Sequence, residues 1–165
     1  MKLTFLGTGA ADWDINAYVP GHFHRRFSSA LVNDDLLIDP GPHIFHFAET
    51  SGQPGLLDNV KNIIVTHTHG DHFTPETVER LCAGRDCTLW GDPVCMKRLI
   101  KALGAERASK IRFVETTVLR PFPYEIGGYK VYSLRSNHDS GDVTETTRLY
   151  VIGDGERCLY YGCDS

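Results

Sequence analysis

The feature that most constrains the fold of this chain is an apolar run that leads directly into a cluster of histidines. Residues 62–66 read Asn-Ile-Ile-Val-Thr, a run rich in β-branched side chains that is typical of a strand covered on both faces. Residues 67–72 read His-Thr-His-Gly-Asp-His and begin where this strand stops. The sequence therefore predicts a loop with four potential metal ligands at the end of a buried strand.

The spacing within this motif suits two metal ions. Side chains at i and i+2 of an extended segment point the same way, so His67 and His69 can bind one ion. Gly70 allows a sharp turn that can direct Asp71 and His72 to a second ion, because two metals about 3.5 to 4 Å apart need ligands from both sides of one tight loop. Solvated loop histidines are the alternative, and the density of ligands directly after a buried strand argues against it.

Turn and capping signals divide the rest of the chain into strands and helices. Thr74-Pro75 and Asp92-Pro93 each place an N-cap candidate before a proline, which predicts the start of a helix. Strands that alternate with helices early and form hairpins later predict an α/β layered domain with mixed sheets. We expect helices at 75–82 and 93–103, a short helix near His43 and His46, and strands at 2–6, 29–32, 36–38, 62–66, 88–90, 111–114, 129–134, 148–152 and 158–161.

Length, charge and cysteine usage restrict the class of protein. The 165 residues fit a single domain, and the net charge of −4 gives no indication of a nucleic-acid partner, which weakens a nuclease function without excluding it. The N-terminus matches neither a signal peptide nor a membrane span. Five cysteines without a C-x-x-C pair are typical of reduced thiols, so we expect a cytoplasmic protein with no membrane partner.

A strand that ends in His-x-His-x-Asp-His resembles the signature of the metallo-β-lactamase superfamily, and the resemblance covers most of the chain in order. It implies an αββα sandwich, a later lone histidine on the first metal and a bridging aspartate. His138 follows the 129–134 strand and matches the histidine, whereas Asp164 follows the 158–161 strand and matches the aspartate. The resemblance thus implies one metal on His67, His69 and His138 and a second on Asp71, His72 and Asp164.

The segments Phe5-Leu6-Gly7-Thr8-Gly9 and 25–32 also look like the branch that contains tRNase Z and the cyclic phosphodiesterases of phosphonate breakdown. The sequence departs from that branch at several points. It lacks the cysteines that hold a structural zinc in those phosphodiesterases, and Pro40-Gly41-Pro42-His43 replaces the Gly-Glu-Gly-Thr-Gln-like run of the tRNA-processing enzymes. A basic arm for gripping tRNA is also missing from the sequence.

The ligand set indicates hydrolysis. Histidine and carboxylate ligands without cysteine suit zinc, with manganese or iron also compatible. A hydroxide shared by two such ions would attack a phosphodiester in a small-molecule or nucleotide-like substrate, with Asp71 as the catalytic residue that orients it and accepts its proton. The alternatives are a lactone or thioester hydrolase, a non-catalytic binding module and a diiron oxidoreductase. The diiron oxidoreductases of the superfamily carry glutamate at the position of His69, so His69 argues for hydrolysis.

Two features outside the motif have open roles. Asp39 could orient a metal ligand or simply form a turn before Pro-Gly, and the two interpretations are evenly matched. His22, His24, Arg25 and Arg26 form a basic cluster that could hold a phosphate or carboxylate, although a solvated loop is the favoured interpretation.

The end of the chain leads to a further expectation. The family architecture continues past the bridging aspartate with more sheet, a helix and a final histidine on the second metal, whereas this sequence stops at Ser165 and has no histidine after His138. We therefore expect an incomplete copy of the fold that lacks its C-terminal portion. A longer parent protein or a second copy in a homo-oligomer would supply the missing layer, and second-site metal binding would be weak.

Overall fold

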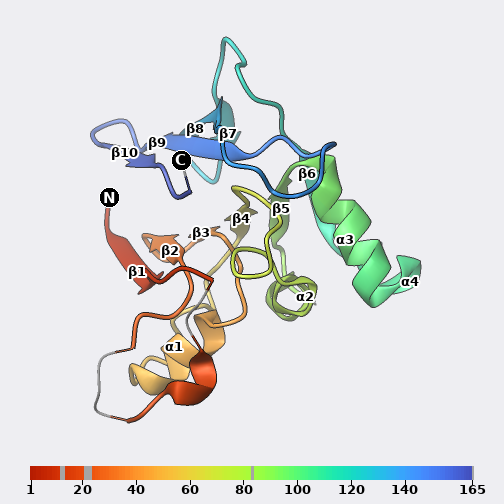
Figure 1. Ribbon diagram of the computed structural model, residues 1–165. Helices are drawn as coiled ribbons and strands as arrows, with labels where there is room; N and C mark the ends of the chain where they lie inside the picture. The colour runs from red at the N-terminus through yellow and green to blue at the C-terminus, as the bar shows by residue number, and fades with distance from the viewer. Residues whose placement is uncertain (12–13, 21–23, 83, 165) are drawn as a thin grey trace.

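The computed structural model describes residues 1–165 apart from 12–13, 21–23, 83 and 165, and these residues form two β-sheets that lie face to face (Figure 1). The first sheet has the strand order β1-β2-β3-β4-β5-β6, and the second has the order β10-β9-β8-β7. The strands are β1 (Leu3–Gly7), β2 (Ser29–Val32), β3 (Leu36–Ile38), β4 (Asn62–Ile64), β5 (Thr88–Gly91), β6 (Arg112–Glu115), β7 (Tyr124–Ile126), β8 (Tyr129–Arg135), β9 (Arg148–Gly153) and β10 (Cys158–Tyr161).

The two sheets differ in the direction of their strands. In the first sheet β1, β2 and β3 pair antiparallel, whereas β3 to β6 pair parallel and place their carboxyl ends at one edge. All pairs in the second sheet are antiparallel. Because β4 lies inside the parallel part, the loop that follows it opens at the edge where ligand sites of parallel sheets form.

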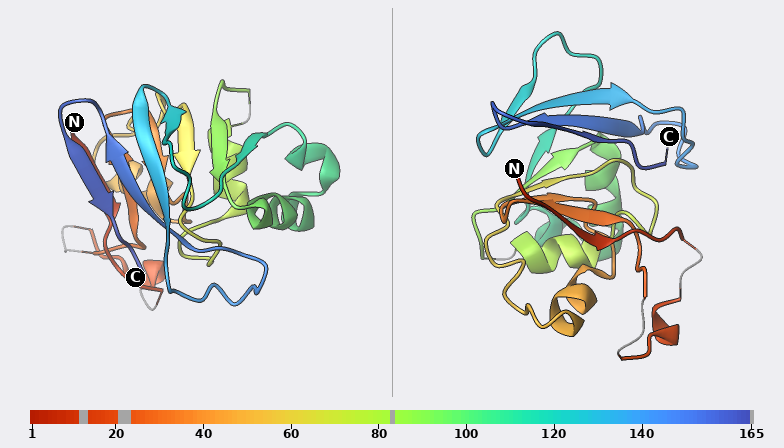
Figure 2. Two further views of the ribbon diagram at one scale, coloured as in Figure 1. Left: turned by 90° about the horizontal axis from the view of Figure 1, so that it is seen from above. Right: turned by 90° about the vertical axis from the view of Figure 1, so that its left-hand side faces the viewer.

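Helices cover the outer face of the first sheet, and the second sheet covers its inner face (Figure 2). The helices are α1 (Ile44–Thr50), α2 (Pro75–Cys82), α3 (Pro93–Leu103) and α4 (Ala105–Ala108), with a short 3-10 helix η1 (Ile15–Ala17). Asp92 caps α3 by accepting a hydrogen bond from the backbone N–H of Val94 at 3.0 Å, as its position before Pro93 predicts. The resulting order of layers is helix, sheet, sheet.

Alternate residues of β4 face the two sides of its sheet, which accounts for its unbroken apolar sequence. Ile63 packs with Val78 and Leu81 of α2 on the helical side. Ile64 packs with Val131 and other residues of the second sheet on the inner side. Both isoleucines are fully buried, so the predicted strand with two covered faces is confirmed.

The second sheet is joined to the end of β4 by polar contacts. The Tyr150 hydroxyl donates to the Val65 carbonyl at 2.6 Å, and the Arg148 backbone N–H donates to the Thr66 carbonyl at 2.9 Å. The Arg148 side chain forms a buried ion pair with Asp92 at 2.9 Å. These contacts fix the second sheet directly beside the start of the histidine motif.

The predicted elements form at the predicted places, with ends shifted by one or two residues. The five cysteines are all free in the structure. Among the described residues, none of the helices is long and apolar enough to cross a membrane.

Candidate metal centre

The histidine motif forms the loop between β4 and α2, and a neighbouring turn packs closely against it. The backbone carbonyl of Asp71 lies 2.2 Å from the position that a Cβ atom on Gly41 would occupy. The Thr74 backbone N–H donates to the Pro40 carbonyl at 3.1 Å. Only glycine fits at position 41, so the turn after β3 and the motif loop form one unit.

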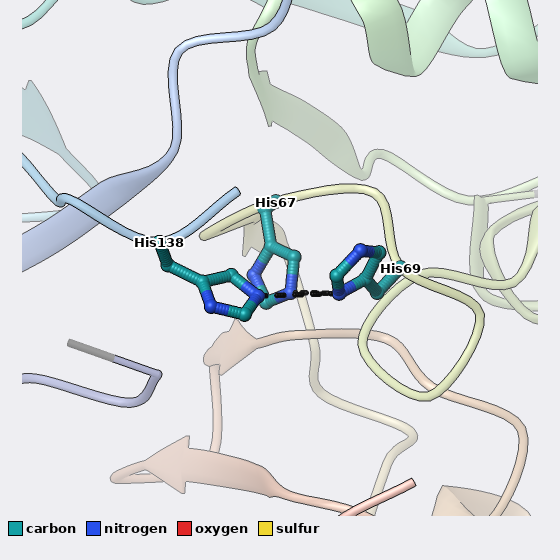
Figure 3. A group of neighbouring side chains, drawn as sticks. All are labelled: His67, His69 and His138. Carbon is teal, nitrogen blue, oxygen red and sulfur yellow. Dashed lines mark hydrogen bonds between the residues drawn. The ribbon is translucent and has the colours of Figure 1, made fainter. Parts of the chain in front are cut away.

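Three histidines converge at one end of this loop (Figure 3). His69 Nδ1 lies 3.0 Å from His67 Nε2 and 3.3 Å from His138 Nε2. His67 is buried, whereas His69 and His138 are partly exposed. His138 follows β8 of the second sheet, so this cluster joins the two sheets through three imidazole nitrogens that face one another.

Asp164 lies between this cluster and His72. Its Oδ2 atom is 3.2 Å from His72 Nε2, 3.7 Å from His67 Nε2 and 3.8 Å from His138 Nε2. His67, His72 and Asp164 form a second group whose potential ligand atoms all lie within 4.8 Å of one another. Asp71 is in neither group, but its Oδ2 atom lies 3.4 Å from His72 Nε2.

Asp39 is completely buried and orients two of the motif histidines. Its Oδ2 atom lies 2.9 Å from His72 Nδ1, so that nitrogen carries the proton. Its carboxylate also accepts from the Thr66 hydroxyl at 2.8 Å. Because that hydroxyl has a single proton, Thr66 must accept the Nδ1 proton of His67 across their 3.0 Å contact.

The Nε2 atoms of His67 and His72 therefore both face the site, with the lone pair of His67 Nε2 directed into it. These linked hydrogen bonds decide between the two roles considered for Asp39. It orients the candidate ligands and does not only form a turn. Sequence patterns give no signal for the part played by Thr66.

The charges of the site depend on burial and on these carboxylates. Burial, followed by the neighbouring His72 and His69, lowers the pKa of His67 to about 3, so His67 is neutral. Burial also lowers the pKa of His72, but hydrogen bonds to Asp39 and Asp71 outweigh it and raise the pKa to about 10. Burial raises the pKa of Asp71, and the hydrogen bond and charge of His72 outweigh that effect, so its pKa is below the ordinary value.

Hydrogen bonds from the second sheet hold His138 and Asp164 together. The Ser136 hydroxyl donates to the Asp164 carbonyl at 3.1 Å and accepts from the His138 backbone N–H at 3.1 Å. Thr147 donates to the His138 carbonyl at 2.7 Å. The structure thus brings five of the six residues named from the sequence into two contiguous groups, with Asp71 beside them.

The solvated-loop interpretation of the basic cluster before β2 is wrong for two of its members. His24 is 9% exposed and Arg26 is 8% exposed, whereas Arg25 is exposed. His22 lies outside the described residues. Burial depends on what the fold places over a loop, which residue type alone does not reveal.

The chain belongs to the beta-lactamase superfamily, whose domain model matches residues 35–165. No curated protein sequence matches the chain. The helix, sheet and sheet layers of the described residues agree with the first three layers of the αββα frame implied by the sequence motif.

Solved structures share this fold at low sequence identity. The metallo-beta-lactamase fold protein YhfI from Bacillus subtilis is 17% identical with a TM-score of 0.71, and the match covers 99% of this chain and 61% of that one. Zn²⁺-bound PqqB from Methylobacterium extorquens is 16% identical with a TM-score of 0.68, over 97% of this chain and 64% of that one. The flavodiiron protein from Giardia intestinalis is 14% identical with a TM-score of 0.60, over 95% of this chain and 37% of that one. The chain therefore spans less than two thirds of the length of these proteins.

Proposed function

We propose that this protein is a metal-dependent hydrolase whose metal ions are held by His67, His69, His138, Asp71, His72 and Asp164. The observation that carries the proposal is the convergence of three imidazole nitrogens, with His69 Nδ1 at 3.0 and 3.3 Å from its two neighbours. Three imidazole nitrogens that face one point are a donor set that suits zinc, and iron or manganese are compatible with it.

The hydrogen-bond pattern supports the fit of metal ions to these residues. The proton of His67 is on Nδ1, which leaves its Nε2 lone pair available as a ligand. The carboxylate of Asp39 holds Nδ1 of His72, so a bound ion would displace the proton from His72 Nε2. Asp164 Oδ2 lies between the two groups, where one carboxylate can serve both. Bound divalent ions would supply Lewis-acid activation of water and would neutralise charge that develops on the attacked group.

The residues of the chain itself would position the reactants. Asp71 is ionised near neutral pH because its pKa lies below the ordinary value, so its carboxylate can accept a hydrogen bond from the attacking water. A cavity of about 550 Å³ adjoins His138 and is lined mainly by polar residues of the 135–147 segment, among them Ser136, Asn137 and Thr146. A polar cavity beside the metal ligands favours a polar substrate.

A phosphodiester is the substrate class that we propose. The support is the resemblance of Gly7-Thr8-Gly9 and of 25–32 to the phosphodiesterase branch. Lactone or thioester hydrolysis is the second candidate of the same chemistry. The flavodiiron protein from Giardia intestinalis shares the fold, but the imidazole of His69 in the three-histidine group favours hydrolysis over a diiron oxidoreductase here.

Metal analysis and a substrate panel test this proposal. The purified chain should contain one to two transition metals, and replacing both His67 and His69 by alanine should remove them. The control is His43→Gln, a buried histidine outside both groups, which should keep its metal. An unchanged metal content in the double variant would contradict the metal centre, and an iron charge-transfer spectrum would favour the oxidoreductase.

Activity is tested with bis-nitrophenyl phosphate, cyclic nucleotides and lactones. Asp71→Asn should lower kcat on the best substrate by about a hundredfold or more, because it removes the carboxylate that orients the water. Hydrolysis of lactones with every phosphodiester left intact would reverse the ranking of substrates.

A further inference from the structure

Arg26 has a strained and closely supported backbone. Its φ angle is +54°, in the left-handed region that non-glycine residues rarely adopt. The Gly7-Thr8-Gly9 loop fixes this conformation, because the Gly9 backbone N–H donates to the Arg26 carbonyl at 2.7 Å. A Cβ atom on Gly7 would lie 1.9 Å from the Phe27 carbonyl oxygen, so the two segments approach as closely as glycine permits. Strain that is held in this way is typical of functional positions.

The guanidinium group of Arg26 is buried, and its hydrogen bonds to described residues go to neutral acceptors. Nε donates to His46 Nδ1 at 3.0 Å, Nη1 to the His24 carbonyl at 3.1 Å and Nη2 to Thr50 Oγ1 at 2.6 Å. The guanidinium has five N–H groups, and these bonds use three of them. Among the described residues nothing else accepts from it, so two donors are left there for another acceptor.

This cation has no carboxylate partner within the part of the chain that the structure describes. The other arginines that form ion pairs there pair with aspartate or glutamate, and Arg26 is not among them. The rings of Tyr18 and Phe47 each lie 5.4 Å from its Cζ atom, and they offset only part of the cost of burying a charge. A buried and unneutralised guanidinium is a strong attractor for an anion.

Arg26 lines a cavity of about 450 Å³ between the end of β1 and helix α1. The same cavity is lined by Thr8, Tyr18, Arg25 and Ser51, which supply hydroxyl groups and a second cation. Figure 1 shows β1 and α1 beside each other, with the histidine loop after β4 on the other side of the β2 and β3 strands. None of the described metal ligands lines this cavity.

We propose that this cavity is an anion-binding site, separate from the metal centre, in which Arg26 binds a phosphate or carboxylate group. The planar guanidinium fork matches two oxygens of such a group, and the aromatic rings of Tyr18 and Phe47 hold the fork in place. The site does not depend on the proposed hydrolase function, because none of its lining residues is a proposed metal ligand.

Thermal unfolding with increasing inorganic phosphate at constant ionic strength tests this site. Phosphate should raise the Tm of the wild-type chain, because a ligand that binds only the folded state stabilises it. Arg26→Gln should weaken phosphate binding by about tenfold to a hundredfold, the effect of losing charge-assisted hydrogen bonds. The matched control is Arg112→Gln, an exposed arginine on β6 that should keep the full phosphate effect.

A further variant distinguishes phosphate binding at Arg26 from phosphate binding to metal ions. The double replacement His67→Ala with His69→Ala should keep the phosphate effect if Arg26 is responsible. Loss of the effect in this variant, or an equal effect in wild type and Arg26→Gln, would overturn the proposal. Failure of phosphate and acetate to raise the Tm of the wild-type chain would overturn it as well.

A measurement on the wild-type chain covers the case that Arg26→Gln does not fold. The Nε–H resonance of Arg26 should shift on titration with phosphate, and an unchanged resonance would contradict the site. Acetate and phenyl phosphate identify the source of the anion. Tighter binding of phenyl phosphate than of inorganic phosphate would indicate a phosphate monoester as the ligand, and equal binding would indicate the free ion.

Discussion

The two halves of the metal centre are held in different ways. His67 and His72, from the motif loop, are 2% and 1% exposed and are oriented by Asp39 directly or through Thr66. His138 and Asp164, from the second sheet, have side chains that are 30% and 36% exposed.

The first half is therefore fixed by contacts close to the motif, whereas the second half depends on how the two sheets dock. Ligands held by buried hydrogen bonds need no further organisation before an ion binds. Ligands that come from another sheet respond to any change that loosens the interface between the sheets. Four predictions test this difference, from the largest expected effect to the smallest.

Replacing Arg148 by alanine should have the largest effect, because it removes the buried ion pair between the sheets. Arg148 is 2% exposed and its Nη2 atom donates to Asp92 Oδ2 at 2.9 Å. The free energy of unfolding, measured by urea denaturation, should fall by about 3 to 5 kcal/mol because the buried charge of Asp92 loses its cationic partner. The control is the double variant with Asp92→Asn, which keeps the helix cap and should be less destabilised than the single variant. A double variant that is less stable than Arg148→Ala would contradict this account.

Lowering the pH should destabilise the turn after β3, which packs against the motif loop, through His43. Burial, followed by smaller contributions from His46, His24 and Arg26, lowers the pKa of His43 to about 4 from the ordinary value of 6.5. The folded state thus favours the neutral imidazole, so its contribution is complete above pH 6.5 and is lost as the pH falls towards 4. The loss should reach about 3 kcal/mol in the metal-free protein. His43→Gln should flatten the curve of unfolding free energy against pH, and an identical slope in the variant would refute the assignment to His43.

Replacing Asp39 by asparagine should weaken metal binding without removing a ligand. The amide cannot accept the Nδ1 proton of His72 and the Thr66 hydroxyl proton as the carboxylate does. Metal affinity, measured by competition with a chelator, should fall by about tenfold to a hundredfold. Asp34→Asn, at an exposed position, should leave the affinity unchanged. An affinity equal to wild type in the Asp39 variant would show that the histidines need no such support.

Replacing Ser136 by alanine should have the smallest effect of the four. Its hydroxyl joins His138 to Asp164 through two hydrogen bonds of 3.1 Å each. Their loss should cost about 1 kcal/mol in the free energy of unfolding and should lower metal affinity less than Asp39→Asn does. Ser109→Ala removes a hydroxyl at an exposed position and serves as the control. A larger loss of affinity in the Ser136 variant than in the Asp39 variant would reverse the comparison between the two halves.

The sequence by itself determined the elements that local signals specify. The unbroken run at 62–66 predicts a strand with two covered faces, because residues on both sides of β4 must be apolar to pack against helices and against a second sheet. Asp92 before Pro93 predicts the start of α3, because capping depends on a few adjacent residues. The ligands of the motif loop were also readable, since four of them lie within six positions.

Only the tertiary structure decided how distant residues meet. The His69 and His138 nitrogens come within 3.3 Å although 69 positions separate them, and that distance depends on the packing of one sheet on the other. His138 and Asp164 were identified as ligands from the resemblance to a family, because their local sequence alone gives no such signal. The role of Asp39 was open because a carboxylate before Pro-Gly suits a turn and a metal site equally, until burial and the contact with His72 distinguished them. Arg26 was expected in solvent because charged residues usually are, and its burial follows from a helix and a loop that the chain places over it.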